Sequence, residues 1–360
     1  MYRSFTVKNF RCFRELALGD LKRVNLIAGA NNVGKTALLE ALFLHGGAYN
    51  PAFALRLSAM RGVENVKLGL GRWVEAPWNA LFHQFDISKR IELAGENTAT
   101  GCRALRLRVV REPAELAEIA LSLPYTPRES TGFLQSPEIS QVLELEHEEG
   151  DRHGKVYMIV DGKGIRTEPL PPAPPFPVFF QSARSRIPFI EEAERFSQLD
   201  LQGKRDDLLQ ALKITEPRLN RLAVTVESGE TMLQGDIGLS RLIPLPLMGE
   251  GIARLASLML YISSAPNGVV LVDEIENGLH HSILIKVWHA LGEIARQYNT
   301  QIFATTHNWE CIVAAHQAFS KNEFYDLGLY RLDRVKENVE AVTYDQETLE
   351  AAFEIGMEIR

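Results

Sequence analysis

The residues best suited to chemistry lie in a glycine-rich loop between a predicted strand and a predicted helix. The loop reads GANNVGKT, and it follows the apolar run Val24 to Ile27 and precedes the helix-forming run ALLEALFL. Glycines at both ends of such a loop let successive backbone N–H groups point inward, and the following helix adds the positive end of its dipole. The predicted phosphate site consists of Gly29, Ala30, Asn31, Asn32, Val33, Gly34, Lys35 and Thr36.

Two side chains of this loop suit a nucleoside triphosphate. Lys35 is placed to neutralise the β- and γ-phosphates, and the Thr36 hydroxyl is placed to ligate Mg²⁺. The alternative is a glycine-rich turn that carries Lys-Thr by coincidence. The strand before the loop and the helix after it are the context that the motif requires, so they favour a site for ATP and Mg²⁺.

A second candidate segment is the apolar strand GVVLVDE, which ends in two carboxylates at Asp273 and Glu274. The carboxyl ends of buried strands open at the ligand crevice of an α/β sheet. There Asp273 would hold Mg²⁺ through a water, and Glu274 would polarise the water that attacks the γ-phosphate. The competing interpretation is that the two acidic residues only cap the segment that follows.

Two further segments fit the same crevice. The strand QIFATTH ends at His307, which is placed to contact the γ-phosphate or to hold the attacking water. A lone histidine is more often structural, but this one follows Asp273 by one strand-helix-strand unit. The segment MGEGIARL opens a helix at Gly249, Glu250 and Gly251, whose free N–H groups could bind an anion although no lysine accompanies them.

Composition limits the class of protein. The 360 residues are 46% apolar and 24% charged, which is ordinary for a folded protein of one large domain or two. The net charge of −7 argues against a protein that coats nucleic acid, although a local basic patch remains compatible with it. Cys12, Cys102 and Cys311 are far apart in the sequence, show no spacing typical of a metal site, and suit the reducing cytoplasm. We expect neither a signal peptide nor a membrane span.

The order of predicted elements indicates an α/β fold with a mostly parallel core sheet. Between residues of about 80 and 170, the runs ALRLRVV, AEIALSL, QVLELEH and KVYMIVDG alternate in polarity and predict antiparallel hairpins. Six prolines among residues 169–177 then predict a stiff connector. Helices are expected over residues 188–199, 204–212, 251–263 and 283–298.

In combination, these motifs resemble the P-loop ABC-type ATPases. Within them, the stretches FTVKNFRCF, DEIENGLHH and ATTHNWE are most similar to the RecF, SMC and OLD group, specifically its standalone AAA-type ATP-binding proteins. The resemblance spans nearly the whole chain. It implies a single ATPase head over residues 1–360. The core lobe would comprise residues of about 1–180 and 265–360, with an antiparallel insertion at about 80–170. A helical signature lobe would comprise residues of about 181–264.

The resemblance also implies how the site works. In that family two heads clamp two ATP molecules, so Gly249, Glu250 and Gly251 would act on the ATP held by a second copy, and Asn277 to His280 would lie at the interface. The segment from Met248 to Gly251, MGEG, departs from the common Leu-Ser-Gly-Gly signature and lacks its serine hydroxyl. The family also has a glutamine at the junction of the two lobes, and Gln181 is the best match, with Gln84 as the weaker candidate. The alternative is that Gln181 is a surface glutamine without a role.

Two other pairs of residues invite a functional reading. His280 and His281 are adjacent and would point to different sides, so a structural or interface role is favoured over a metal site. Arg184 and Arg186 could contact phosphate or a partner, but they are more readily interpreted as surface charges that pair weakly with nearby glutamates.

Several cellular roles are compatible with this ATPase. One is a dimerising switch that acts on DNA in maintenance or phage defence. Large proteins of this kind usually carry a coiled coil or a nuclease domain. Here we expect no coiled coil, and too few residues follow His307 for a nuclease domain. The alternative is a regulatory ATPase that controls a protein effector, encoded nearby, without touching nucleic acid. A metabolite kinase is disfavoured because it needs neither the signature helix nor the strand-end histidine.

Overall fold

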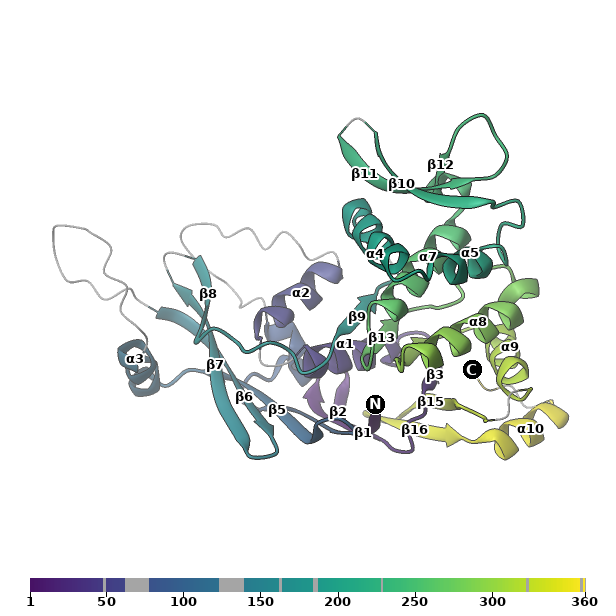
Figure 1. The fold of residues 1–360 in the computed structure, drawn as a ribbon. Coiled ribbons are helices and arrows are strands. Elements are labelled where there is room, and N and C mark those ends of the chain that lie inside the picture. Colours follow the sequence, from purple (N-terminus) through teal and green to yellow (C-terminus); the bar gives the residue numbers. More distant parts are fainter. Residues whose placement is uncertain are drawn as a thin grey trace.

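Two sheets with a helix between them position the phosphate loop (Figure 1). The computed structural model describes residues 1–47, 50–61, 78–122, 139–161, 164–183, 187–227, 229–321, 324–356 and 359. The core sheet has the order β16-β15-β3-β14-β13-β9, and only β16 runs antiparallel to its neighbour. Its strands are β3 (Val24–Ala28), β9 (Val178–Gln181), β13 (Val269–Val272), β14 (Gln301–Thr305), β15 (Leu327–Val335) and β16 (Asn338–Tyr344).

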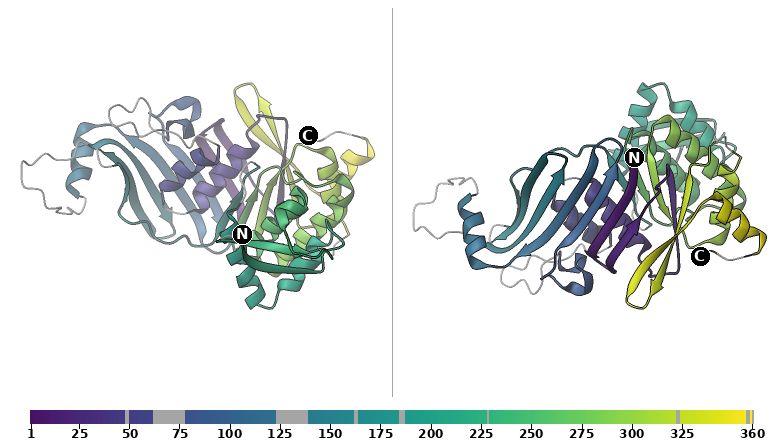
Figure 2. Two further views of the ribbon diagram at one scale, coloured as in Figure 1. Left: turned by 90° about the horizontal axis from the view of Figure 1, so that it is seen from above. Right: turned by 90° about the horizontal axis from the view of Figure 1, so that it is seen from below.

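The second sheet is antiparallel, with the order β2-β1-β4-β5-β6-β7-β8. Figure 2 shows it extending away from the core sheet, so that its far strands lie at one end of the molecule. Ion pairs such as that between Arg106 and Glu148 connect neighbouring strands of this sheet. Its strands are β1 (Tyr2–Phe10), β2 (Phe13–Leu18), β4 (Ile91–Asn97), β5 (Gly101–Val110), β6 (Ile139–Glu149), β7 (Arg152–Asp161) and β8 (Gly164–Glu168).

Helix α1 (Lys35–Gly46) lies between the two sheets and is buried along almost its whole length. Its apolar side chains pack on one side against strands of the antiparallel sheet and on the other against Ile27, Leu271 and Phe303 of the core sheet. The opposite face of the core sheet is covered by a second apolar cluster from helices later in the chain. Because both faces are covered, β3, β13 and β14 are buried at every residue.

Helix α2 lies beside α1, α3 lies at the outer end of the antiparallel sheet, and most other helices lie around the core sheet (Figure 1). Between β9 and β13, helices α4 to α7 accompany a small antiparallel sheet formed by β10 (Arg221–Glu227), β11 (Glu230–Asp236) and β12 (Ile243–Pro244). The helices are α2 (Ala52–Met60), α3 (Pro113–Ser122), α4 (Phe189–Leu201), α5 (Arg205–Leu212), α6 (Leu245–Met248), α7 (Glu250–Ser263), α8 (Leu284–Gln297), α9 (Trp309–Phe319) and α10 (Gln346–Glu354), with single 3-10 turns at Asn79–Leu81, His83–Phe85 and His281–Ile283.

The mostly parallel core sheet and the antiparallel strands are confirmed, but one predicted strand is wrong. Of the run AEIALSL, the residues from Ala117 to Ser122 belong to α3 and not to a hairpin. Pro113 presets the backbone angle of a helix start, and Leu116 and Ile119 fall three residues apart on the side that packs against β6 and β7. The antiparallel sheet also extends beyond residues 80–170, since β1 and β2 form one side of it.

The stretch predicted as a helical lobe contains the β10–β12 sheet as well, and this sheet was not expected. The division of the chain into a core lobe and a signature lobe remains a prediction. Arg184 and Arg186 lie outside the described residues.

The register of the core sheet brings the predicted motifs to one edge. Val272 pairs with Gln181 on one side and with Ala304 on the other, and Thr305 pairs with Ile27. The carboxyl ends of β9, β13, β14 and β3 therefore lie side by side, and the phosphate loop begins at the same edge.

Candidate active site

The backbone of the phosphate loop depends on its two glycines. Gly29 has φ 136° and Gly34 has φ 119°, conformations that residues with a Cβ rarely adopt. A Cβ on Gly29 would lie 2.5 Å from the Leu332 carbonyl oxygen, and one on Gly34 would lie 2.6 Å from Cys12 Sγ. Both positions therefore require glycine for two independent reasons.

The Lys35 ammonium lies inside the curve of this loop. Its Nζ donates to the carbonyl oxygens of Gly29 at 2.6 Å and Ala30 at 3.0 Å. Burial lowers the pKa of Lys35, and the nearby carboxylates Asp273 and Glu274 oppose that shift. The lysine is thus a cation held at the mouth of the loop, where phosphate oxygens would replace the carbonyls as its partners.

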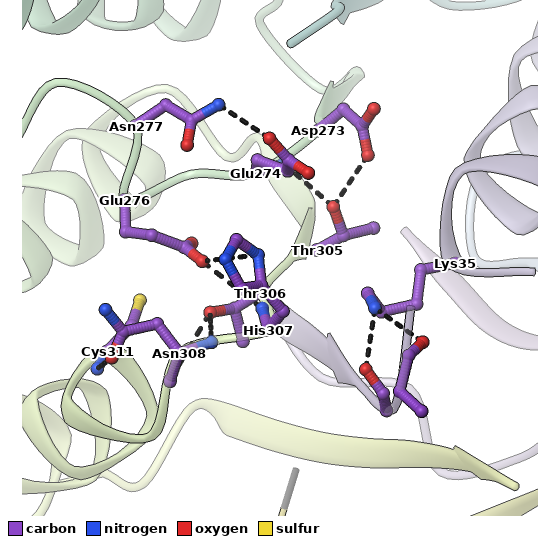
Figure 3. A network of polar contacts seen from close by, with 12 residues as sticks. Lys35, Asp273, Glu274, Glu276, Asn277, Thr305, Thr306, His307, Asn308 and Cys311 are labelled. Carbon is purple, nitrogen blue, oxygen red and sulfur yellow. Dashed lines mark hydrogen bonds and ion pairs between the residues drawn. The ribbon is translucent and has the colours of Figure 1, made fainter. Parts of the chain in front are cut away.

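Asp273 connects the phosphate loop to the neighbouring strand ends. Its carboxylate accepts hydrogen bonds from the Thr36 hydroxyl at 3.0 Å and from the Thr305 hydroxyl at 2.8 Å. Figure 3 shows Asp273 and Thr305 together at the edge of the sheet, with Lys35 facing them. A carboxylate and a hydroxyl oxygen in contact are the ligand types that Mg²⁺ takes in proteins, so Thr36 and Asp273 fit the predicted metal site.

Glu274 has a strained backbone that its neighbours hold in place. Its φ of 49° is left-handed, which is uncommon for a residue other than glycine. Its N–H donates to Thr305 Oγ1 at 2.8 Å, and its carboxylate accepts from Asn277 Nδ2 at 2.7 Å (Figure 3). These contacts fix the direction of the carboxylate, as a general base requires.

Arg254 of α7 ties the signature helix to this segment. Its Nη2 donates to the carbonyl oxygens of Asp273 and Glu274, and its own carbonyl accepts from Gln181 Nε2 at 3.3 Å. Burial lowers the pKa of the guanidinium, while the surrounding carboxylates favour its charged form. Arg254 was not singled out in the sequence, because only the fold brings α7 against the end of β13.

Replacing Arg254 with methionine is expected to lower ATP turnover at least tenfold while ATP binding is largely retained. The variant leaves two buried carbonyls without a donor, a loss of about 1–3 kcal/mol, and releases the strained backbone at Glu274. Steady-state hydrolysis and a binding titration measure the two effects. The matched control is Arg205→Met, at an exposed arginine of α5, which should hydrolyse ATP like wild type. Wild-type turnover in Arg254→Met would show that Arg254 does not position Glu274.

A cavity of about 540 Å³ lies along the phosphate loop. Its lining includes Lys35, Thr36, Asp273, Glu274 and Thr305, so the structure brings these five residues together. Its size is that of a small-molecule site. Its lining also includes Arg11, Cys12, Ala80, Phe82, Gln84 and Phe85.

Three arginines, Arg11, Arg61 and Arg334, add positive charge to this cavity, and two of them share one partner. Arg11 Nε donates to Glu40 Oε2 at 3.0 Å, and Arg61 Nη2 donates to the same oxygen at 2.9 Å. Glu40 lies one turn after the loop on α1 and is only 1% exposed. One buried carboxylate thus orients both guanidinium groups, and no spacing in the sequence signals this cluster.

His307 lies beside the cavity and not in its lining. Glu276 accepts a hydrogen bond from the His307 backbone N–H at 3.2 Å, and its carboxylate lies 3.4 Å from Nδ1 of the ring (Figure 3). Glu276 is buried and His307 is half exposed. The histidine therefore has a fixed position at the strand end, and Glu276 is a functional candidate that sequence reasoning missed.

The predicted signature does not line the cavity of its own chain. Gly249, with φ 136°, and Glu250 are exposed, whereas Gly251 packs so closely on the next loop that a Cβ would lie 2.4 Å from the Gly278 carbonyl oxygen. The start of α7 is therefore held firmly against the segment after β13 while its outer side faces solvent.

The two glutamine candidates occupy different places. Gln181 ends β9, is buried, and its carbonyl accepts from the Asp273 N–H at 2.9 Å. Gln84 instead lies in the 3-10 turn His83–Phe85 and lines the nucleotide cavity, with a left-handed φ of 53°. The lobe-junction role of Gln181 stays a prediction, and its position at the sheet edge is compatible with it.

The adjacent histidines lie outside these contacts. The rings of His280 and His281 are 4.1 Å apart, and both side chains are exposed. Within the described residues, no group of three or more His, Cys, Asp or Glu could hold a metal ion. Over the same residues, none of the helices is long and apolar enough to cross a bilayer.

Comparison with solved structures supports the fold. Over 97% of this chain and 99% of the other, the structure superposes with a TM-score of 0.51 on an Smc head bound to the C-winged helix domain of ScpA, at 11% sequence identity. A Pyrococcus furiosus Smc head domain with an extended coiled coil, bound to the C-terminal domain of ScpA, gives a TM-score of 0.50 at 10% identity over 99% of each chain.

Two curated proteins also match the chain in sequence. A Helicobacter pylori protein named ATP/GTP phosphatase is 23% identical, with 98% of both chains aligned. An uncharacterized Methanocaldococcus jannaschii protein is 41% identical over 63 residues, which are 18% of this chain and 28% of that protein.

Two family models match the chain. One, described as "AAA ATPase domain", matches residues 1–126, and the other, described as "AAA domain, putative AbiEii toxin, Type IV TA system", matches residues 81–311. The second alone covers more than half of the sequence. The chain therefore belongs to this AAA-domain family, and it is an ATPase with the fold of an SMC head.

Proposed function

We propose that this ATPase works as a nucleotide-driven dimer in which each ATP is bound by one chain and closed over by the signature of another. The observation that carries the proposal is the position of Gly249 to Gly251, which are held at a helix start but lie outside the cavity that contains Lys35. Exposed N–H groups at a helix start bind anions, and a second copy would supply one as the γ-phosphate.

Within one chain, the proposed roles follow the contacts. Gly29 to Thr36 bind the phosphates, with Lys35 as the cation, and Thr36 and Asp273 are the side chains that would hold Mg²⁺. Bound Mg²⁺ neutralises phosphate charge during transfer. Glu274 acts as the base toward the attacking water. His307 follows β14 and Gln181 ends β9, on either side of β13, where γ-phosphate oxygens would be contacted.

The signature of this chain lacks the usual serine, and the start of α7 offers backbone N–H groups in its place. Gly249 has open space around the position of a Cβ, so the backbone N–H groups of the α7 start are accessible from outside. The contact to the second ATP would therefore come from backbone donors and the helix dipole, without a hydroxyl.

For the cellular role, we propose DNA maintenance or phage defence in the cytoplasm, with DNA or a protein encoded nearby as the partner. The Smc heads of similar fold and the family description, which names a toxin-antitoxin system, support this class of role. A regulatory ATPase that controls a protein effector is the second candidate. It is favoured by the antiparallel sheet, where Arg106 pairs with Glu148 and Arg108 with Glu144, so that arginine charge there is neutralised.

DNA binding with and without ATP separates the two roles. If the protein acts on DNA, duplex DNA should bind more tightly with ATP, and the affinity should fall steeply between about 50 and 200 mM salt as counterions return to the phosphates. The Glu274→Gln protein, which should keep ATP bound, is the best form to test. Absence of binding even at the lowest salt would exclude direct action on DNA and leave the effector role.

A further inference from the structure

Part of the lining of the nucleotide cavity has the features of a nucleobase site. Three residues on the phosphate side, Asp273, Glu274 and Thr305, lie at the strand ends where the γ-phosphate would be. The triphosphate follows the loop and the start of α1, so the base must lie away from those strand ends. Besides the phosphate loop, the start of α1 and these strand ends, the cavity is lined by Arg61, Arg334, the β1–β2 turn and the two 3-10 turns.

A continuous set of contacts connects these turns to the loop. Cys12 touches the position where a Cβ of Gly34 would be, and the Arg11 N–H donates to the Leu81 carbonyl at 2.7 Å. His83 Nδ1 lies 2.9 Å from the Arg11 carbonyl oxygen. Phe82 forms an isolated β-bridge with Phe10. The segment that leads into Gln84 is therefore held rigidly beside the phosphate loop.

At the end of this segment, two consecutive side chains have an unusual backbone. Gln84 has φ 53° and Phe85 has φ 59°, both in the left-handed region, whereas the preceding Phe82 is fully packed. Strained backbone of this kind persists where surrounding structure holds it, and it clusters at ligand sites. Its effect here is to leave Phe85 67% exposed while both residues line the cavity.

The chemistry of the pair suits a purine. An exposed aromatic ring offers a face on which any base can stack. The Gln84 amide makes no hydrogen bond to other described residues, and it carries a donor and an acceptor side by side. Adenine presents a donor at N6 and an acceptor at N1, and guanine presents an acceptor at O6 and a donor at N1. Rotation of one amide by 180° therefore matches either base.

We propose that Phe85 and Gln84 form the nucleobase subsite of this ATPase, and that the Gln84 amide lets it accept ATP and GTP alike. The inference rests on the proposed use of Gly29 to Thr36 as the phosphate site. In this proposal the 3-10 turn at His83–Phe85 determines which nucleobases the site accepts. Gln84 thus serves a purpose different from that of the lobe-junction glutamine, for which it was the weaker candidate.

Binding titrations with ATP, GTP and inorganic tripolyphosphate test the stacking role. Phe85→Leu should weaken ATP and GTP about tenfold, because stacking is lost, and should leave tripolyphosphate unchanged. Phe85→Trp should restore nucleotide affinity. Phe324 is also exposed but does not line the cavity, so Phe324→Leu is the matched control and should bind all three ligands normally. Unchanged ATP and GTP affinity in Phe85→Leu would overturn the proposal.

The ratio of GTP to ATP affinity tests the role of Gln84. Gln84→Glu replaces the amide by an acceptor only, so it should shift this ratio toward GTP by about tenfold or more, whereas Gln84→Ala should lower both affinities without such a shift. A ratio that is the same in wild type and Gln84→Glu would remove Gln84 from base recognition. Lys35→Ala separates the two proposals: it should weaken tripolyphosphate as well, and if it does not, the phosphate site itself is misplaced.

Discussion

ATP turnover is expected to fall by about 10²- to 10⁴-fold when Glu274 is replaced by glutamine, the range for loss of a general base. The side chains have the same shape, and Asn277 and Thr305 still hold the segment in its strained conformation. ATP should therefore bind with near wild-type affinity but remain unhydrolysed. Since ATP is proposed to join two chains, the ATP-bound dimer should accumulate, which light scattering with ATP and with ADP measures.

The matched control for this variant is Glu293→Gln. Glu293 lies on α8, away from the nucleotide cavity, and its side chain is exposed. It should hydrolyse ATP like wild type. Turnover of Glu274→Gln at the wild-type rate would show that another group activates the water, and Glu276, the buried carboxylate two residues later, would be the next to test.

Nucleotide binding itself should be lost in Lys35→Ala, with affinity for ATP reduced by about 100-fold or more. In the wild type the ammonium already lies in the curve of the loop, bonded to the Gly29 and Ala30 carbonyls, and a charge-assisted hydrogen bond to phosphate contributes more than a neutral one. Equilibrium titration with ATP measures the loss.

Exposed Lys286 on α8 provides the control for charge removal alone, and Lys286→Ala should bind ATP normally. The melting temperature of Lys35→Ala should also rise less on addition of ATP than that of wild type, because a ligand stabilises only the form that binds it. Full ATP affinity in Lys35→Ala would contradict the assignment of the loop as the phosphate site.

Much of the central fold could be predicted because its signals are local. Strands β3, β13 and β14 are short apolar runs with turn residues at their ends, and the glycines of the loop are needed for its own backbone. The local pattern of Ala117 to Ser122 fits both a strand and a helix, and only the proline before it and its packing decide that it belongs to α3. The C-terminal β15 joins the core sheet beside β3, a pairing between distant segments that no local pattern shows.

The same distinction explains the site. Lys35, Thr36, Asp273 and Glu274 stand in motifs whose spacing implies their chemistry, and the structure places all four on one cavity. Arg254 and Glu276 act through contacts between helix and loop or between two strand ends. Glu40 joins Arg11 and Arg61 from different elements. Such residues support the motif residues, and their roles depend on tertiary contacts that the sequence does not encode locally.

The composite nature of the site can be measured by mixing two inactive proteins. Glu274→Gln removes the base but keeps the signature, and Gly249→Asp places a negative charge at the signature while its own Lys35 and Glu274 remain intact. The position of a Cβ at Gly249 has no neighbour within 4 Å, although its φ of 136° strains any side chain, so thermal melting must first show that this variant is folded.

The decisive measurement is the ATP turnover of the two variants alone and mixed at equal concentration. In a mixed dimer, the intact Lys35 and Glu274 of the Gly249→Asp chain would face the intact signature of the Glu274→Gln chain. We therefore expect the mixture to hydrolyse ATP well above the sum of the rates of the two separate variants. Turnover equal to that sum would contradict a site built from two chains.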